Sequence, residues 1–125
     1  MRVHGDDRRL GYWAVFPTDH GDVNILHLYD GALSAWHRHQ RQTDWFFCAK
    51  GCVKIGWIKD DQGGWIVLDE RNPGPVEITP NTWHGYQAFA GNATLVMWAS
   101  EHYDPTDEEK KSVDEMGVAW QRVPR

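Results

Sequence analysis

The stretch that decides the fold is GALSAWHRHQRQTDWFFCAKG, which runs from Gly31 to Gly51. A glycine bounds it at each end, and between the glycines lie His37, His39 and Asp44. Alternate side chains of a β-strand share one face, so the two histidines point the same way and the residue between them points the other way. Two imidazoles on one face, followed by a carboxylate, are candidates for proton transfer or for metal ligation.

The spacing of these residues resembles the first sequence motif of the cupin superfamily. Written as a pattern, the stretch is G-x5-H-x-H-x4-D-x6-G, with Asp44 in the acid position. A second cupin-like block follows in GPVEITPNTWHGYQAF, which contains Gly74, Pro80 and His84. Two blocks in this order are far more specific than a lone H-x-H. The resemblance implies an all-β jelly-roll barrel, the cupin double-stranded β-helix, with a pocket inside it.

The rest of the chain independently predicts short strands separated by turns. Between residues 53 and 59, apolar side chains alternate with lysine and glycine, which is typical of a half-buried strand. Repeated strands with frequent Gly, Asp, Asn and Pro turns indicate an antiparallel sandwich or barrel. The predicted strands are Val23–Tyr29, Leu33–His39, Asp44–Ala49, Val53–Lys59, Trp65–Asp69, Val76–Thr79, Trp83–Phe89 and Thr94–Ser100.

The chain length and the two ends complete the predicted architecture. A chain of 125 residues is one domain by its length, so residues 1–125 are assigned to a single cupin domain. Residues 1–11 are charged and contain glycine, which predicts an N-terminal arm. Near the C-terminus, Asp104 is a suitable cap and Pro105 suits the first helical position, which predicts a short helix that ends at Met116.

Charge and hydropathy exclude several classes of partner. The net charge is −5 and the sequence contains no basic run, so nucleic acid is not an expected partner. No apolar stretch approaches the roughly 20 residues that a membrane-spanning helix needs. The N-terminal segment is polar and does not resemble a secretory signal. A cytoplasmic location is therefore predicted.

Further motifs resemble the sugar-nucleotide branch of the RmlC-like cupins. SAWHRH followed by Gly51, then PNTWH, then ASEHYDPTDEE are similar to the pattern of the dTDP-4-keto-6-deoxyhexose 3,4-ketoisomerases. His84–Gly85–Tyr86, and the Y-x-P-x-x-E spacing from Tyr103 to Glu108, resemble the dTDP-4-dehydrorhamnose 3,5-epimerases. The resemblance implies a homodimeric isomerase or epimerase of deoxysugar biosynthesis that acts on a nucleotide-linked sugar and binds no metal.

The resemblance assigns catalytic roles to three histidines and a tyrosine. His37 is expected to remove a proton next to the C4 ketone of the sugar, with His39 beside it and His84 on the facing strand. Neutral imidazole suits this task near pH 7. Tyr103 is a candidate donor to the enolate oxygen, and Tyr86 is a second candidate for the same role. Met97 stands where the epimerases carry their tyrosine acid, so the inventory favours isomerisation with a single base over epimerisation.

Substrate binding is predicted for a second set of residues. Ser34 replaces the arginine that binds the diphosphate in both related families, and Arg41 is one candidate to take its place. Tryptophan rings are able to stack on a sugar or a base. The residues assigned to substrate binding are Asp44, Arg41, Trp83, Tyr86 and Trp36. If the same pocket performs no reaction, the chain is a non-catalytic carbohydrate- or small-molecule-binding module.

A metal centre is the other alternative. His37, His39, Asp44 and His84 form a set of three imidazoles and one carboxylate, which suits Zn, Fe, Mn or Ni. A bound metal makes oxygenase or other metal-assisted chemistry available. Asp44 also has a purely structural alternative, an ion pair with a nearby arginine such as Arg38 or Arg41.

Overall fold

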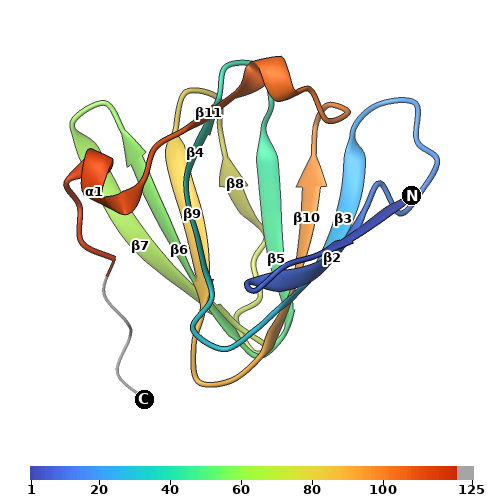
Figure 1. Cartoon of the computed structure of the whole chain (residues 1–125), viewed down its shortest axis with the longest axis horizontal. Coiled ribbons are helices and arrows are strands. Elements are labelled where there is room, and N and C mark those ends of the chain that lie inside the picture. Colours follow the sequence, from blue (N-terminus) through green and yellow to red (C-terminus); the bar gives the residue numbers. More distant parts are fainter. Residues whose placement is uncertain (121–125) are drawn as a thin grey trace.

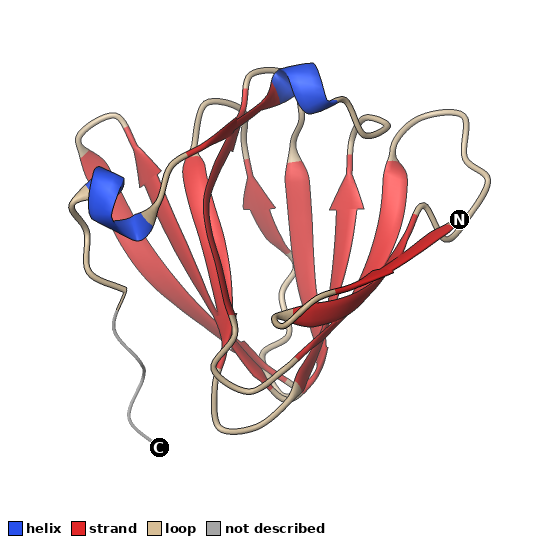
Figure 2. Ribbon diagram, in the orientation of Figure 1, coloured by secondary structure: helices blue, strands red, loops and turns tan. Residues whose placement is uncertain are grey.

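The computed structural model describes residues 1–120, which fold almost entirely as β-structure (Figures 1 and 2). Their elements are β1 (Arg2–Gly5), β2 (Arg9–Trp13), β3 (Asp22–Leu28), β4 (Leu33–His39), β5 (Asp44–Lys50), β6 (Cys52–Lys59), β7 (Gln62–Asp69), β8 (Val76–Ile78), β9 (Trp83–Ala88), β10 (Ala93–Ala99), the 3-10 helix η1 (Pro105–Asp107), β11 (Glu108–Lys110) and α1 (Val113–Met116). The strands form two facing sheets, ordered β1-β2-β3-β10-β5-β8 and β11-β4-β9-β6-β7, with antiparallel pairing throughout. The predicted all-β jelly-roll fold with a short C-terminal helix is confirmed.

Every strand predicted between residues 23 and 100 is present. β7 begins at Gln62, before the predicted Trp65, because the turn from β6 uses only residues 60 and 61. The glycines that bound the decisive stretch have positive φ angles, +77° at Gly31 and +81° at Gly51. Residues with a side chain rarely adopt this backbone conformation. Glycine is therefore required at the turn before β4 and at the turn after β5.

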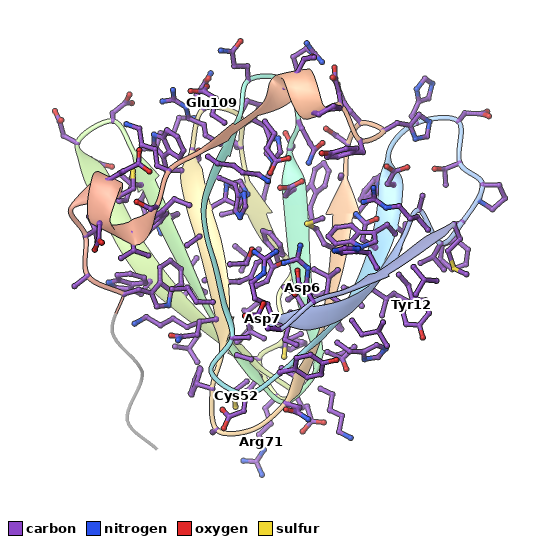
Figure 3. All side chains as sticks on the ribbon, viewed as in Figure 1. Asp6, Asp7, Tyr12, Cys52, Arg71 and Glu109 are labelled. Atoms are coloured by element: carbon purple, nitrogen blue, oxygen red, sulfur yellow. The ribbon has the colours of Figure 1, made fainter. Side chains whose placement is uncertain are left out.

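The first eleven residues, predicted as an arm, form most of a β-hairpin. β1 pairs with β2, and β2 pairs with β3, so the hairpin extends the six-stranded sheet. Figure 3 labels Asp6 and Asp7 at its turn, which lies toward β4 of the opposite sheet. The sequence pattern predicts neither strand, because RVHG and RLGYW lack a clear apolar alternation. Homodimerisation and the single-domain assignment stay predictions.

The helix predicted from residue 104 to residue 116 is wrong over most of its length. Asp104 caps only the single turn of η1, and the chain then becomes β11, which pairs with β4. The α-helix is the short α1, which ends at Met116 as predicted, with Gly117 as its C-cap. Pairing as a strand lets Glu108 contact His37, and this tertiary contact outweighs the helical tendency of a charged run. Neither helix in the described part of the chain is long or apolar enough to cross a membrane.

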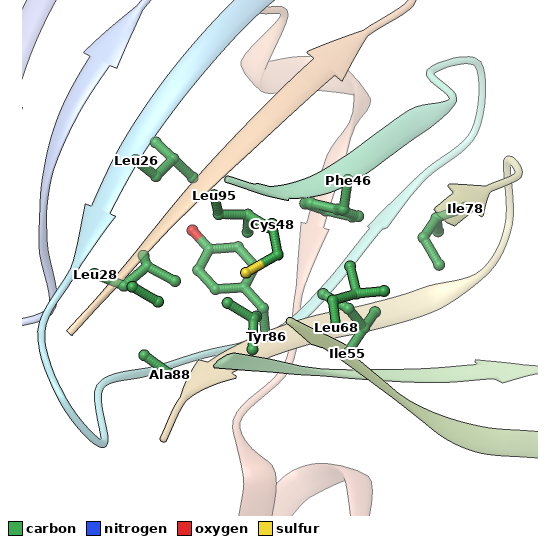
Figure 4. Close-up of a cluster of buried hydrophobic side chains, with 12 residues drawn as sticks. Leu26, Leu28, Phe46, Cys48, Ile55, Leu68, Ile78, Tyr86, Ala88 and Leu95 are labelled. Atoms are coloured by element: carbon green, nitrogen blue, oxygen red, sulfur yellow. The ribbon is translucent and has the colours of Figure 1, made fainter. Parts of the chain in front are cut away.

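One end of the barrel interior is a hydrophobic core (Figure 4). Strands from both sheets contribute to it, and most of its side chains are almost fully buried. The core consists of Leu26, Leu28, Phe46, Cys48, Val53, Ile55, Leu68, Ile78, Tyr86, Ala88, Ala93 and Leu95. It closes the barrel at this end and leaves the other end for the cavity described next.

Candidate active site

A cavity of about 400 Å³ occupies the other end of the barrel interior. His37 and His39 from β4 and His84 from β9 all line it. The ring centroid of His84 lies 6.4 Å from that of His37 and 5.7 Å from that of His39. The structure therefore brings together the three imidazoles that the two sequence blocks contribute.

The pairing of β4 with β9 positions these rings. Ser34 lies opposite Tyr86, and His37 lies opposite His84. The register shifts between Ala35 and His37, so this irregularity interrupts the strict alternation of side chains. As a result, Ser34 and His37 both line the cavity, although strict alternation would place residues three positions apart on opposite faces.

Gly85 allows the two strands to approach closely enough for this arrangement. A Cβ atom at this position would collide with Ala35 and with the backbone of Ser34. The glycine that follows the second-block histidine therefore has a packing role. It keeps the cavity faces of β4 and β9 in register.

His37 and Glu108 form a partly buried hydrogen-bonded pair. The Nδ1 atom of His37 lies 3.1 Å from Oε1 of Glu108, and this bond lowers the pKa of Glu108 to about 2. Because an ionised carboxylate only accepts hydrogen bonds, Nδ1 is the protonated nitrogen of His37. Burial lowers the pKa of His37, which favours the neutral ring. Its Nε2 lone pair is then available, and the hydroxyl of Ser34 lies 3.1 Å from it.

Asp44 holds the other two histidines together. It is 2% exposed, and its Oδ2 atom lies 3.2 Å from Nε2 of His84 and 3.7 Å from Nε2 of His39. Its Oδ1 atom accepts a 2.7 Å hydrogen bond from the side-chain amide of Gln42. Asp44 therefore faces the histidines inside the barrel, and its structural alternative, an ion pair with Arg38 or Arg41, is not formed.

The two candidate tyrosines lie at different depths. Tyr86 lines the cavity and is buried, and burial raises the pKa of its hydroxyl. The neutral hydroxyl is thus retained as a hydrogen-bond donor. Tyr103 also lines the cavity but is 60% exposed, and the guanidinium carbon of Arg2 lies 5.6 Å from its ring centroid. Tyr103 is therefore a residue of the cavity mouth.

Three of the residues predicted to bind substrate lie away from the cavity. Arg41 is directed outward, where it pairs with Glu101 and with Asp104 at 2.6 Å. Trp36 packs against other indole rings on the outer face of the five-stranded sheet. Trp83 lies beneath Arg38, whose guanidinium carbon is 4.5 Å from the centroid of the Trp83 ring.

Trp36 and Trp83 lie outside this cavity because each directly precedes a cavity histidine. Adjacent residues of a strand point to opposite faces. Arg38, between the two histidines of β4, obeys the same rule and points outward as expected.

Several cavity residues are absent from the predicted set. Glu108 is part of the Y-x-P-x-x-E spacing, so the sequence carried a signal for it. Arg8 and Arg9 line the cavity from the N-terminal hairpin, and an Nη1 atom of each lies 3.4 Å from Oγ of Ser34. No short motif marks this contact, because it joins segments 25 residues apart.

Comparison with protein families gives a match over most of the chain. The matching family model is described as "FdtA: WxcM-like, C-terminal", and it matches residues 25–115. This range contains the three histidines, Asp44 and Glu108. It begins after the N-terminal hairpin.

Individual relatives are enzymes or proteins of sugar biosynthesis. The probable low-salt glycan biosynthesis epimerase Agl13 of Haloferax volcanii is 29% identical over 94 residues, which is 68% of this chain and 60% of that protein. The chain thus spans less than two thirds of this relative. QdtA, a sugar 3,4-ketoisomerase from Thermoanaerobacterium thermosaccharolyticum solved in complex with TDP, is 26% identical with a TM-score of 0.66, covering 82% of this chain and 74% of QdtA.

A third similarity concerns the fold alone. The capsular polysaccharide assembling protein CapF from Staphylococcus aureus is 20% identical, with a TM-score of 0.79 over 87% of this chain and 31% of CapF. The cupin barrel found here is thus also a part of larger proteins.

Proposed function

Since the chain belongs to the FdtA family of RmlC-like cupins, we propose that it is an isomerase of a nucleotide-linked 4-keto-deoxyhexose, with His37 as the catalytic base. The observation that carries the proposal is the His37–Glu108 pair inside the cavity. Glu108 fixes the proton on Nδ1, so the basic Nε2 atom is the nitrogen available to a ligand. Agl13 and QdtA, named as an epimerase and a ketoisomerase, support the reaction class.

The proposed reaction moves one hydrogen between adjacent carbons. His37 removes the proton from C3, and the electron pair of that C–H bond forms a C3–C4 double bond while the C4 oxygen becomes an enolate. His37 then returns the proton to C4, while the hydroxyl proton at O3 passes to O4. The product is the 3-ketone, with the same atoms as the substrate.

The side chains around the cavity favour this reaction over epimerisation at two carbons. Transfer between neighbouring carbons needs only one base, whereas epimerisation requires proton delivery from the opposite face. Met97, on the facing strand β10, lines the cavity and offers no acidic proton. Tyr86 and Tyr103 are the proposed donors to the enolate oxygen, where a hydrogen bond stabilises the developing charge.

Hydrogen exchange tests the role of His37. Purified protein is incubated in D2O with dTDP-4-keto-6-deoxyglucose, and deuterium at C3 is followed by NMR. We expect exchange in the native protein and at least about a hundredfold less in His37→Gln. His27→Gln is the matched control, because His27 is exposed on β3 and contacts Thr94 and the ring of Tyr12, neither of which lines the cavity.

The proposal is contradicted if the native protein binds the sugar nucleotide without exchange, or if exchange persists in His37→Gln. The first result favours the non-catalytic binding module. The second result moves the base to another group of the cavity.

A metal-assisted reaction is the second candidate, and the cluster of His39, Asp44 and His84 favours it. One ligand atom from each lies within 4.8 Å of the others. Nδ1 of His84 lies 2.9 Å from the carbonyl oxygen of Thr82, to which it donates. Nε2 of His84 then faces an oxygen of Asp44 at 3.2 Å, where either a shared proton or a metal ion would bridge the two atoms.

This cluster lacks one of the four predicted ligands, His37, which is hydrogen-bonded to Glu108 instead. A metal bound by the three remaining residues would supply Lewis-acid chemistry at the sugar carbonyl. Elemental analysis of the purified protein tests the candidate. Stoichiometric Zn, Fe, Mn or Ni that is lost in His84→Gln supports it, and protein that exchanges deuterium after complete chelation contradicts it.

A further inference from the structure

We propose that Asp107 is a positioning residue of the active site, because its buried carboxylate holds the C-terminal segment against the turn after β4 and thereby keeps Glu108 on His37. The catalytic importance of the His37–Glu108 pair rests on the proposed function. The attachment of the C-terminal segment to the turn rests on the hydrogen bonds and the burial of Asp107.

Asp107 binds three successive backbone N–H groups of the turn that joins β4 to β5. Its Oδ1 atom accepts hydrogen bonds from Gln40 at 3.1 Å and from Arg41 at 3.2 Å. Its Oδ2 atom accepts hydrogen bonds from Arg41 at 3.3 Å and from Gln42 at 3.2 Å. Successive N–H groups form a concave binding site for an anion. Here a carboxylate of the same chain occupies that site.

Burial makes this contact stronger than the other polar contacts at the same end of the C-terminal segment. Asp107 is 5% exposed. The side chain of Arg41 also reaches Glu101 and Asp104, but these contacts are solvent-exposed. Exposed ion pairs contribute little to stability, whereas hydrogen bonds from N–H groups to a buried carboxylate are charge-assisted. Asp107 is therefore the main anchor of this end of the segment.

The anchor lies next to the His37–Glu108 pair on both segments that form the pair. Gln40 directly follows His39 at the end of β4, and Glu108 directly follows Asp107. From there β11 runs antiparallel to β4, with Glu108 opposite His39 (Figure 1). Oε1 of Glu108 reaches Nδ1 of His37 at 3.1 Å. A displacement of Asp107 from the turn therefore moves Glu108 relative to His37.

The strand β11 is too short to keep this position without an anchor. It has three residues at the edge of the five-stranded sheet, where β4 is its one neighbour among the described strands. Short terminal elements of this kind separate easily from their neighbours. Reciprocal backbone hydrogen bonds between Trp36 and Lys111, of 2.9 and 3.1 Å, hold its far end. Asp107 holds the end that carries Glu108.

Asp107 acts through Glu108 and does not contact a ligand in the cavity. Glu108 and Lys110 line the cavity from the C-terminal segment, whereas Asp107 is not among the described residues that line it. The carboxylate of Asp107 is instead enclosed by the turn after β4. Loss of this carboxylate should therefore reduce the rate of the reaction more than the affinity for the substrate.

The variant Asp107→Asn tests the proposal, because an amide replaces one acceptor oxygen with a donor that faces the N–H groups. Asp114→Asn makes the same chemical change at an exposed position of α1 and is the matched control. With dTDP-4-keto-6-deoxyglucose in D2O, we expect kcat for C3 exchange to fall about tenfold in Asp107→Asn, with KM unchanged. The control should exchange as the native protein does. Native kcat in folded Asp107→Asn overturns the proposal.

Two further measurements distinguish positioning from a role in folding alone. In 15N-edited NMR, the native protein should show a protected Nδ1–H signal of His37 that is absent from His37→Gln. This signal should weaken in folded Asp107→Asn. Exchange in Asp107→Asn/Glu108→Gln should lie within about twofold of that in Glu108→Gln, because both changes act on the same hydrogen bond. An unchanged signal or additive losses overturn the positioning role.

Asp107→Glu covers the case in which Asp107→Asn does not fold. It keeps the carboxylate but adds a methylene group, which moves β11 away from the turn. We expect a smaller loss, with kcat about threefold below that of the native protein and a weakened Nδ1–H signal. A native rate together with a native signal in this variant overturns the proposal.

The positioning role and the proposed function fail in different ways. If the native protein shows no C3 exchange but the Nδ1–H signal of His37 depends on Asp107, the positioning role stands on a protein with another function. If the native protein exchanges C3 and the folded Asp107 variants keep both the rate and the signal, the positioning role is wrong and the isomerase stands.

Discussion

The two ends of the barrel interior are built by the same strands but from opposite kinds of residue. On β9, His84 faces the cavity at one end and Ala88 faces the core at the other. On β5 the corresponding residues are Asp44 and Cys48. The inward face therefore changes from polar to apolar along each strand, while the alternation of inward and outward side chains is kept.

This difference separates stability from chemistry within one small fold. Burial of apolar side chains drives folding at the core end. At the cavity end, buried and partly buried polar groups are tolerated because they hydrogen-bond to one another, as the buried His84 does to Asp44 and the partly buried His37 does to Glu108. We expect substitutions at the core end to change the free energy of unfolding and substitutions at the cavity end to change activity.

The largest expected effect on stability comes from Leu95→Ala at the core end. Leu95 is fully buried, so the loss of its side chain leaves a cavity and should cost about 2–5 kcal/mol of unfolding free energy. Urea denaturation followed by tryptophan fluorescence measures this change. The C3 exchange rate per folded molecule should stay close to that of the native protein.

Val96→Ala is the matched control, because Val96 is the next residue on β10 and is only half-buried on the other face. Its effect should be clearly smaller than that of Leu95→Ala. If Leu95→Ala is as stable as the native protein but inactive, the separation of stability at the core end from activity at the cavity end is wrong.

A smaller effect, on activity alone, is expected from Glu108→Gln at the cavity end. The amide no longer fixes the proton of His37 on Nδ1, so kcat should fall about a hundredfold. Burial lowers the pKa of His37, and the hydrogen bond that His37 donates to Glu108 partly offsets this, so loss of the carboxylate should let that pKa fall further. Since the base is active when neutral, the acid limb of the pH–activity profile should move to lower pH.

Glu109→Gln provides the control for this prediction, because Glu109 is the next residue of β11 and pairs with Arg38 outside the cavity. Its pH–activity profile should match that of the native protein. A fall in kcat for Glu108→Gln without any movement of the acid limb would indicate that Glu108 has only a structural role.

Much of the cavity end follows from the sequence, because strand alternation is a local rule. The alternation places His37 and His39 on one face, and the second block supplies His84. The same rule, applied to their neighbours, would have placed Trp36 and Trp83 outside. The interruption near Ala35, which brings Ser34 to the cavity, depends on how β4 meets β9 and is not visible in the sequence.

The parts that the sequence does not predict depend on contacts between distant segments. The charged run that forms β11 has a helical composition, and only its pairing with β4 makes it a strand. Arg8 and Arg9 belong to a segment without strand periodicity, and their importance appears only where they reach Ser34. Short-range patterns cannot encode such pairings.

The smallest expected effect concerns the rim of the cavity, where His102 lies 2.8 Å from Asp22. This hydrogen bond raises the pKa of His102 above its ordinary value of 6.5. A raised pKa in the folded state means that the stabilisation is fully present below pH 6.5 and is lost as pH rises through the folded-state value. His102 is solvent-exposed, so the change should be much smaller than that of Leu95→Ala.

Urea denaturation of native protein and His102→Gln across this pH range measures the effect. The native protein should be the more stable of the two in mild acid, and the difference should shrink as pH rises. His20→Gln, in the exposed loop before β3, is the matched control. A difference that is constant with pH would show that the ion pair at the rim contributes nothing to stability through titration of His102.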